Sequence, residues 1–179
     1  MKITIHRGTH QIGGCATEIC TAYTRIFVDF GSALDGSAGI QIEGLNTGKA
    51  ACDGVLLTHY HGDHVGEINT ILPGIPLYCG ETARLIMQKL NSRTKQTDGD
   101  VLLNMNTFAQ GQSFQIGDIK ITPYSVDHSA YDSYMFLIEA EGKRVLHTGD
   151  FRTHGFRGKG VPKVLEKLVG KVDVLICEG

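Results

Sequence analysis

Residues 58 to 66 carry most of the structural information in this chain, and they read Thr58-His59-Tyr60-His61-Gly62-Asp63-His64-Val65-Gly66. Four imidazole or carboxylate side chains fall within six of these positions, and they cannot all face one way on a strand or a helix. We therefore expect a tight loop in which His59 and His61 turn toward one point, and Asp63 and His64 toward a second point beside it. The alternative, a loop of solvated histidines, is disfavoured by this density of ligands.

The metal expected at such a loop follows from the chemistry of its donors. Imidazole nitrogen and carboxylate oxygen suit Zn²⁺, Mn²⁺ or Fe, and zinc is the first expectation. Two further groups of the same kind occur later in the chain, at His128 and Asp150. Taken alone, either residue is as easily a surface residue at the end of a strand.

The segments on either side of the loop predict a strand that leads into it and a helix that leads out. Residues 54–58 form an almost continuous apolar run, typical of a central strand buried on both faces. After the loop, apolar residues recur at helical spacing from Val65 to Leu72, until Pro73 and Gly74 end the helix.

The remaining patterns predict a mixed α/β chain. The N-terminal part is expected to form an antiparallel meander followed by a long loop, and the C-terminal part to end on a buried strand. The expected strands are 2–6, 17–22, 25–30, 76–79, short strands near 108 and 114, 118–122, 133–140, 143–147 and 172–177; the expected helices are 81–93 and 162–169, with a loop over 31–49, a polar linker near 98–100 and a hairpin turn at 141–142.

Composition narrows the class of protein. With 179 residues and 41% apolar content, the chain is expected to form one domain spanning residues 1–179. The net charge of −2 gives no footprint of an autonomous nucleic-acid binder, so any contact with a polyanion has to be local.

The cysteines and the hydropathy indicate the compartment. The five cysteines are odd in number and contain no Cys-x-x-Cys pair, which argues against a disulfide framework and a separate structural zinc site. The sequence also shows neither a signal peptide nor an apolar stretch long enough to span a membrane. A cytoplasmic protein is expected.

The run from Thr58 to Gly66 resembles the His-x-His-x-Asp-His signature of the metallo-β-lactamase superfamily of di-metal hydrolases. Three further features match that family in order, namely Asp29 at the end of an early strand, His128 in Asp-His-Ser, and Asp150 in Thr-Gly-Asp. Within the superfamily, residues 147–152 (His-Thr-Gly-Asp-Phe-Arg) and 175–179 (Leu-Ile-Cys-Glu-Gly) look like the ribonuclease J and β-CASP nuclease branch.

This resemblance implies an αββα sandwich, of which this chain contains the N-terminal part and is incomplete at the C-terminus. It also implies two divalent metal ions and a set of ligands. One ion would be held by His59, His61 and His128, the other by Asp63 and His64, with Asp150 bridging both. A seventh ligand, a histidine, would come from a second half of the family fold that this sequence does not contain.

The chemistry implied is hydrolysis by a hydroxide held between the two ions, with phosphodiesters or RNA as the substrate class. Asp63 and Asp150 are the expected catalytic residues, because Asp63 would orient the hydroxide while Asp150 bridges the ions. Asp29 is expected to accept a hydrogen bond from an imidazole or a backbone N–H and so fix the ligand loop.

Three other functions are compatible with the same sequence. The chain could be a metal-binding half-domain without turnover that needs a partner or a missing C-terminal segment. It could be a hydrolase of this fold acting on another, small substrate, or carry out redox chemistry at iron as flavodiiron or persulfide dioxygenase relatives do. His61 disfavours the flavodiiron type, which has Glu at that position.

Contacts outside the metal ligands are less well determined by sequence. Ser129 and Arg152 are candidate substrate contacts, and Arg152 opens a basic stretch that suits phosphate but equally suits a solvated loop. An unfinished sandwich should also expose apolar sheet edge, which predicts self-association, as a homodimer or otherwise.

Overall fold

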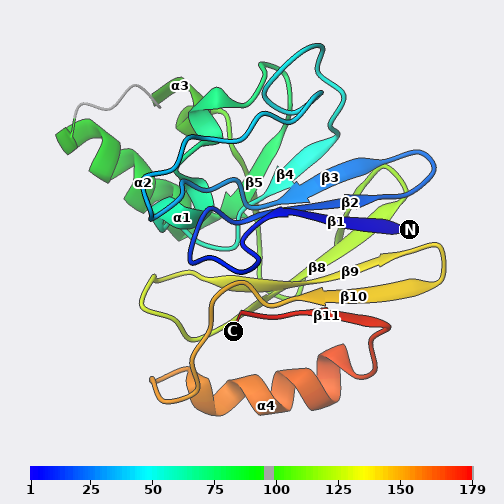
Figure 1. The fold of residues 1–179 in the computed structure, drawn as a ribbon. Helices are drawn as coiled ribbons and strands as arrows, with labels where there is room; N and C mark the ends of the chain where they lie inside the picture. Colours follow the sequence, from blue (N-terminus) through cyan, green and yellow to red (C-terminus); the bar gives the residue numbers. More distant parts are fainter. Residues whose placement is uncertain (95–98, 179) are drawn as a thin grey trace.

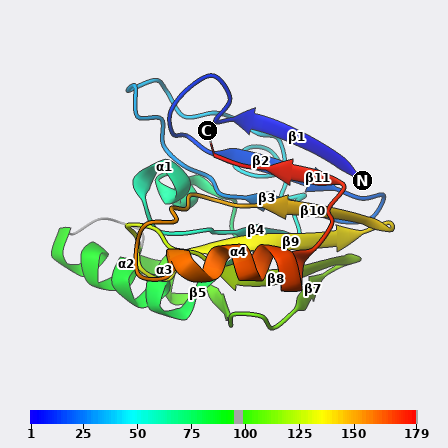
Figure 2. The ribbon, with the colours of Figure 1, turned by 90° about the horizontal axis from the view of Figure 1, so that it is seen from below.

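The structure, a computed structural model, describes residues 1–94 and 99–178. Two β-sheets stack face to face, and helices cover the outer face of each (Figure 1). Seen from below, the helix at residues 161–169 lies across the outside of the second sheet (Figure 2). This four-layer arrangement is the expected αββα sandwich.

The first sheet has six strands in the order β1-β2-β3-β4-β5-β6. The first three pair antiparallel, which confirms the predicted meander, and the last four run parallel. Its strands are β1 (Lys2–Arg7), β2 (Ala16–Cys20), β3 (Arg25–Val28), β4 (Gly54–Leu56), β5 (Leu77–Gly80) and β6 (Asn106–Phe108).

The second sheet has five strands in the order β11-β10-β9-β8-β7. The predicted hairpin turn is present, with Glu141 and Gly142 both at positive φ, the conformation that suits a two-residue turn between twisted strands. Only the β10 and β11 pair is parallel among the described strands of this sheet. Its strands are β7 (Phe114–Ile116), β8 (Ile119–Ser125), β9 (Tyr134–Ala140), β10 (Lys143–His147) and β11 (Val174–Ile176).

The helices lie outside the two sheets. Those of the first half cover the first sheet, and α4 covers the second sheet (Figure 1). Among the described helices, none is both long and apolar enough to cross a lipid bilayer. They are α1 (Gly62–Val65), η1 (Ile68–Thr70), α2 (Glu81–Thr94), α3 (Gly99–Leu103), η2 (Gly158–Gly160), α4 (Val161–Val164) and its continuation η3 (Leu165–Val169).

Alternating side chains divide the apolar residues among three layers. In β3, Ile26 and Val28 face the second sheet while Phe27 faces the helices. In β9, Phe136 packs between the sheets and Leu137 packs under α4. Because successive side chains of a strand point to opposite faces, the central strands of both sheets are buried on both sides.

The helix expected over 65–72 was wrong in its position. Instead α1 begins at Gly62, inside the ligand loop (residues 59–64), and ends at Val65. The backbone N–H of Glu67 donates to Phe30 O at 3.1 Å, and Asp63 O accepts from Cys15 N at 2.9 Å. Both groups are therefore taken away from the i→i+4 bond that would continue the helix.

The structure also differs from the expectations for two later segments, the C-terminal strand and the polar linker. The C-terminal strand was expected to be buried, but β11 is an edge strand with Val174 and Leu175 exposed at 40% and 58%. No described strand pairs with its other side, so its backbone groups there are open, while Ile176 packs against the core between the sheets. Of the polar linker expected near 98–100, residue 98 lies outside the described residues, and residues 99 and 100 begin α3.

Candidate metal centre

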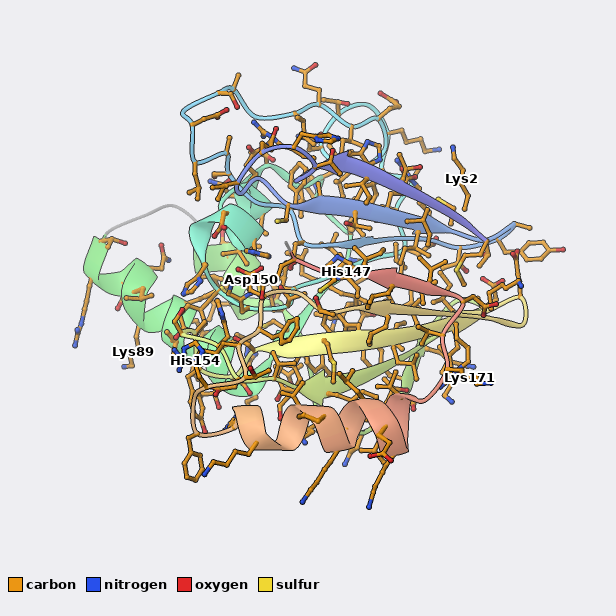
Figure 3. All side chains as sticks on the ribbon, turned by 60° about the horizontal axis from the view of Figure 1, so that its bottom comes forward. Lys2, Lys89, His147, Asp150, His154 and Lys171 are labelled. Carbon is orange, nitrogen blue, oxygen red and sulfur yellow. The ribbon has the colours of Figure 1, made fainter. Side chains whose placement is uncertain are left out.

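The expected ligands meet at one end of the sandwich, because each follows the carboxyl end of a strand. His59 follows β4, while His128 follows β8 and Asp150 follows β10. Strands β8 and β10 both run antiparallel to β9, so their carboxyl ends lie at the same edge. Figure 3 shows Asp150 at this end, close to α1.

Three imidazole nitrogens converge on one point. His59 Nε2 lies 3.1 Å from His61 Nδ1, and His128 Nε2 lies 3.2 Å from the same atom. Asp150 Oδ2 completes the group at 3.9 Å from His59 Nε2 and 3.8 Å from His128 Nε2. Tetrahedral nitrogen ligands on zinc lie about 3.3 Å apart, so this set fits a divalent cation of that kind.

A second convergence lies on the other side of Asp150. His64 Nε2 is 3.2 Å from Asp150 Oδ1 and 3.7 Å from Asp63 Oδ2. The two oxygens of Asp150 thus face two different groups of ligand atoms. A carboxylate placed in this way is suited to bridging two cations. We call these six side chains the metal centre: His59, His61, Asp63, His64, His128 and Asp150.

Asp29 holds the ligand loop from behind. It is fully buried and sits at φ 61°, a left-handed conformation that Asp tolerates better than most residues. Its carboxylate accepts hydrogen bonds from Thr58 N and Thr58 Oγ1, both at 2.8 Å, and from His64 Nδ1 at 2.8 Å. Asp29 therefore contacts both a backbone N–H and an imidazole of the ligand loop.

Thr58 is a positioning residue that the sequence did not single out. Its hydroxyl donates to Asp29 and lies 3.1 Å from His59 Nδ1, from which it can accept. With Nδ1 carrying the proton, the lone pair of His59 Nε2 faces the other ligands. Because both Thr58 and Asp29 are buried, water does not compete for these bonds.

The charges in the centre follow from burial and from close partners. Burial, with the charge on His64, lowers the pKa of His59 to about 3, which favours the neutral ring that binds metals. Burial alone would lower the pKa of His64, but the charge of Asp29 and the hydrogen bonds with Asp150, Asp29 and Cys15 together outweigh burial and raise that pKa. Burial opposes ionisation of Asp150, yet the hydrogen bond and charge of His64 lower its pKa to about 2.

Backbone contacts fix the loop against the N-terminal segments. Phe30 N donates to His64 O at 2.8 Å, and Cys15 N donates to Asp63 O at 2.9 Å. A Cβ on Gly31 would lie 1.6 Å from Asp63 O, so glycine is required for this close approach. The Cys15 thiol also lies 3.8 Å from His64 Nε2. The sequence signal for Cys15 was weak, a glycine pair just before it.

The candidate substrate contacts lie beside the centre. Ser129 and Arg152 line a cavity of about 240 Å³ that His128 also borders. His147 is buried, and its Nδ1 accepts a hydrogen bond from Gly149 N. Glu178, to which the sequence assigned no role, accepts a hydrogen bond from Phe151 N, next to Asp150.

Comparison with known proteins agrees with this geometry. The family model described as "Beta-lactamase superfamily domain" matches residues 34–179. An RNase J-like protein of Methanocaldococcus jannaschii is 27% identical over 188 residues, covering 98% of this chain and 42% of the relative. Ribonuclease J of Helicobacter pylori (strain 26695) is 27% identical over 166 residues, covering 85% of this chain and 23% of the relative.

A solved structure agrees with the fold across almost the whole chain. A protein of unknown function from Enterococcus faecalis V583 aligns with a TM-score of 0.83 at 24% identity, covering 99% of this chain and 49% of that one. The chain spans less than half the length of these two curated relatives and of this structure. The protein belongs to the metallo-β-lactamase superfamily, close to its ribonuclease J-like members.

Proposed function

We propose that this protein is a metal-dependent hydrolase of phosphodiester bonds, with RNA as its substrate class. The observation that carries the proposal is the two-sided placement of Asp150, whose oxygens face two separate groups of nitrogen and oxygen donors. Relatives named ribonuclease J and RNase J-like protein support the choice of substrate.

Two divalent ions fit the donors, and each group would hold one. His59, His61 and His128 would hold the first ion, and Asp63 and His64 the second, with Asp150 shared by both. Zinc is the metal we propose, with Mn or Fe as alternatives, because imidazole predominates among the donors. Bound there, such ions supply a hydroxide at neutral pH and stabilise negative charge that develops on phosphoryl oxygen.

Side chains of the protein would position the reactants. Asp63 points a carboxylate oxygen toward His64 and is partly exposed, so it can accept a hydrogen bond from the attacking water and orient it. Asp29 and Thr58 keep His64 and His59 in place through buried hydrogen bonds, and so preserve the spacing of the two groups.

Hydrolysis of a small and a large phosphodiester tests the proposal. Purified protein loaded with Zn²⁺ or Mn²⁺ is offered bis-p-nitrophenyl phosphate and single-stranded RNA, and metal content is measured by mass spectrometry. We expect two ions per chain and turnover that a chelator abolishes. Turnover that survives the chelator, or no turnover with both ions bound, would contradict the hydrolase.

A second candidate is a metal-binding half-domain without turnover. The exposed apolar edge at β11 favours it, because Val174 and Leu175, which pair with Val145 and Leu146 of β10, are open to solvent. One ion or none per chain, with no hydrolysis, would favour this function over the enzyme.

The same edge leads us to propose self-association, as a homodimer or otherwise, through the second sheet. Apolar residues on a strand at the open edge of a sheet favour pairing with another chain. Light scattering should show a species larger than one chain, and a clean monomer at working concentration would contradict the proposal. All five cysteines are free thiols, which fits the reducing cytoplasm that we propose as its location.

A further inference from the structure

A second surface lies beside the metal centre, on the loops that follow β8 and β10. The cavity there has a volume of about 240 Å³, below the roughly 300–1,000 Å³ of sites that enclose a small molecule. His128 forms the wall that it shares with the metal centre. A cavity of this size and position suits one unit of a polymeric substrate, whose neighbouring bond would then lie at the metal centre.

Aromatic rings stand at the mouth of this cavity. Phe156 is 97% exposed, so its ring is covered by nothing in the described part of the chain. Tyr131 is half-exposed, and the guanidinium of Arg157 lies over its ring at 4.8 Å from the centroid. Tyr131 therefore already has a stacking partner, whereas the face of Phe156 is free to receive one.

The formal charges that line the cavity balance, with two arginines and two aspartates, but both carboxylates are engaged while parts of both guanidinium groups are open. Two acidic residues line it, but Asp127 accepts from Gly158 N and pairs with Arg152 Nε, while Asp132 accepts from Ala83 N and Tyr134 Oη. Within residues 1–94 and 99–178, no carboxylate lies at ion-pair distance from Arg157. Since Arg152 is bound only through Nε, its terminal N–H groups stay available to an anion.

The walls of the cavity are fixed by hydrogen bonds. Tyr131 N donates to the hydroxyl of Tyr60 in the ligand loop at 3.0 Å, and Arg152 N donates to Asp127 O at 2.7 Å. A Cβ on Gly155 would lie 2.0 Å from Asp127 Oδ2, so the 152–158 loop wraps closely around that carboxylate. The arginines are thus presented by loops tied to the metal centre.

We propose that this cavity is a nucleotide subsite for single-stranded RNA. An unpaired base would stack on Phe156, while Arg157 and Arg152 contact the adjoining phosphate, since aromatic stacking and basic side chains together hold single strands. The subsite rests on the proposed function and adds the feature that recognises the substrate. It requires an unpaired base, because the faces of paired bases are covered by their neighbours in the duplex.

Binding to RNA without metal tests the subsite apart from catalysis. Fluorescence anisotropy with a labelled single strand of about ten nucleotides is measured in chelator for the wild type, Phe156→Ala and Arg157→Gln. We expect Phe156→Ala to bind about tenfold more weakly and Phe156→Trp to restore affinity. Arg157→Gln should reduce the slope of log affinity against log salt by about 0.7.

Matched controls exist elsewhere on the surface. Tyr23 is an exposed ring at the β2–β3 turn, and Arg93 is an exposed cation on α2, so Tyr23→Ala and Arg93→Gln should bind RNA within about twofold of the wild type. If Phe156→Ala and Arg157→Gln bind as these controls do, the subsite is wrong. Equal affinity for duplex RNA would overturn it as well.

Hydrolysis of bis-p-nitrophenyl phosphate separates this proposal from the proposed function. RNA binding that depends on Phe156, together with no turnover of either substrate, would refute the hydrolase and support the subsite. Turnover with RNA binding unaffected by Phe156→Ala would refute the subsite alone.

Discussion

The two sheets build the metal centre in different ways. The first sheet supplies a continuous loop whose His59 and His64 are buried, backed by the buried Asp29. The second sheet supplies His128 and Asp150 from two separate loops, and both residues are partly exposed. The first half of the centre is therefore fixed from inside the protein, whereas the second half faces the cavity and the solvent.

This difference indicates separate roles for the two sheets in metal binding and substrate access. Buried hydrogen bonds to a ligand are strong constraints, because a lost partner leaves a polar group without water. Exposed ligands give less rigidity but allow a substrate to approach from their side. Changes behind the first sheet should therefore alter metal affinity, and changes behind the second should alter the handling of RNA.

Substitution of Asp150 should have the largest effect, because its carboxylate lies next to ligands from both sheets. Asp150→Ala should lower phosphodiester turnover more than about a thousandfold, since several kcal/mol of charge stabilisation depend on the metals. Turnover of bis-p-nitrophenyl phosphate and metal content provide the measurement. Asp173→Ala, at an exposed residue before β11, is the control, and a variant that keeps both ions and a tenth of the activity would contradict us.

Asp29 tests the role of the buried hydrogen bonds behind the first sheet. Asp29→Asn keeps the size of the side chain and tolerates the left-handed backbone, but removes the charge that His64 contacts. We expect metal affinity to fall about 10- to 100-fold, measured by competition with a chelating dye. Asp118→Asn, at an exposed turn, should bind metal as the wild type does, and an unchanged Asp29→Asn would sink this role.

Asp127 is the corresponding residue on the second sheet, where it holds the 152–158 loop through Gly158 N and Arg152. Asp127→Asn weakens these charge-assisted bonds, so the KM for RNA should rise roughly tenfold while both ions stay bound. Steady-state kinetics with RNA and with bis-p-nitrophenyl phosphate distinguish the two effects. Loss of metal from Asp127→Asn would contradict us, because residues behind the second sheet would then support metal binding as those behind the first sheet do.

Glu18 gives the smallest expected effect, and it lies on β2 away from the centre. Burial opposes its ionisation, but hydrogen bonds with His6 and Arg25 lower its pKa from 4.5 to about 2. A lowered pKa stabilises the folded state above pH 4.5, and this stabilisation is lost as the pH falls from 4.5 toward 2.

Glu18→Gln should therefore lower the free energy of unfolding by about 1 kcal/mol at pH 7 and by less near pH 3. Urea unfolding at the two pH values measures this, with Glu166→Gln on the exposed side of η3 as the control. Metal content should stay the same. A difference that grows as the pH falls would have the wrong sign and reject the explanation.

Local pattern was sufficient for much of the fold. The meander β1–β3, the buried strand β4, the hairpin at Glu141 and Gly142, and helix α2 all follow from apolar spacing and turn residues. It failed at Gly62–Val65, where hydrogen bonds from Phe30 and Cys15 redirect the backbone, and at β11, whose apolar residues lie on an edge. The hydrogen bonds from Phe30 and Cys15 and the edge position of β11 all depend on residues that are far apart in the chain, so no short stretch of sequence contains them.

The sequence alone determined the kind of chemistry, because four donors within six positions leave a loop few roles other than holding metal. The sequence also determined the order in which the loops at the ends of the strands follow one another along the chain. Only the tertiary structure decided that Asp150 shows one oxygen to each group, that Thr58 and Asp29 orient two imidazoles, and that Phe156 stands open beside Arg157. Such facts depend on where separate strands end in space, which sheet packing sets and residue order does not.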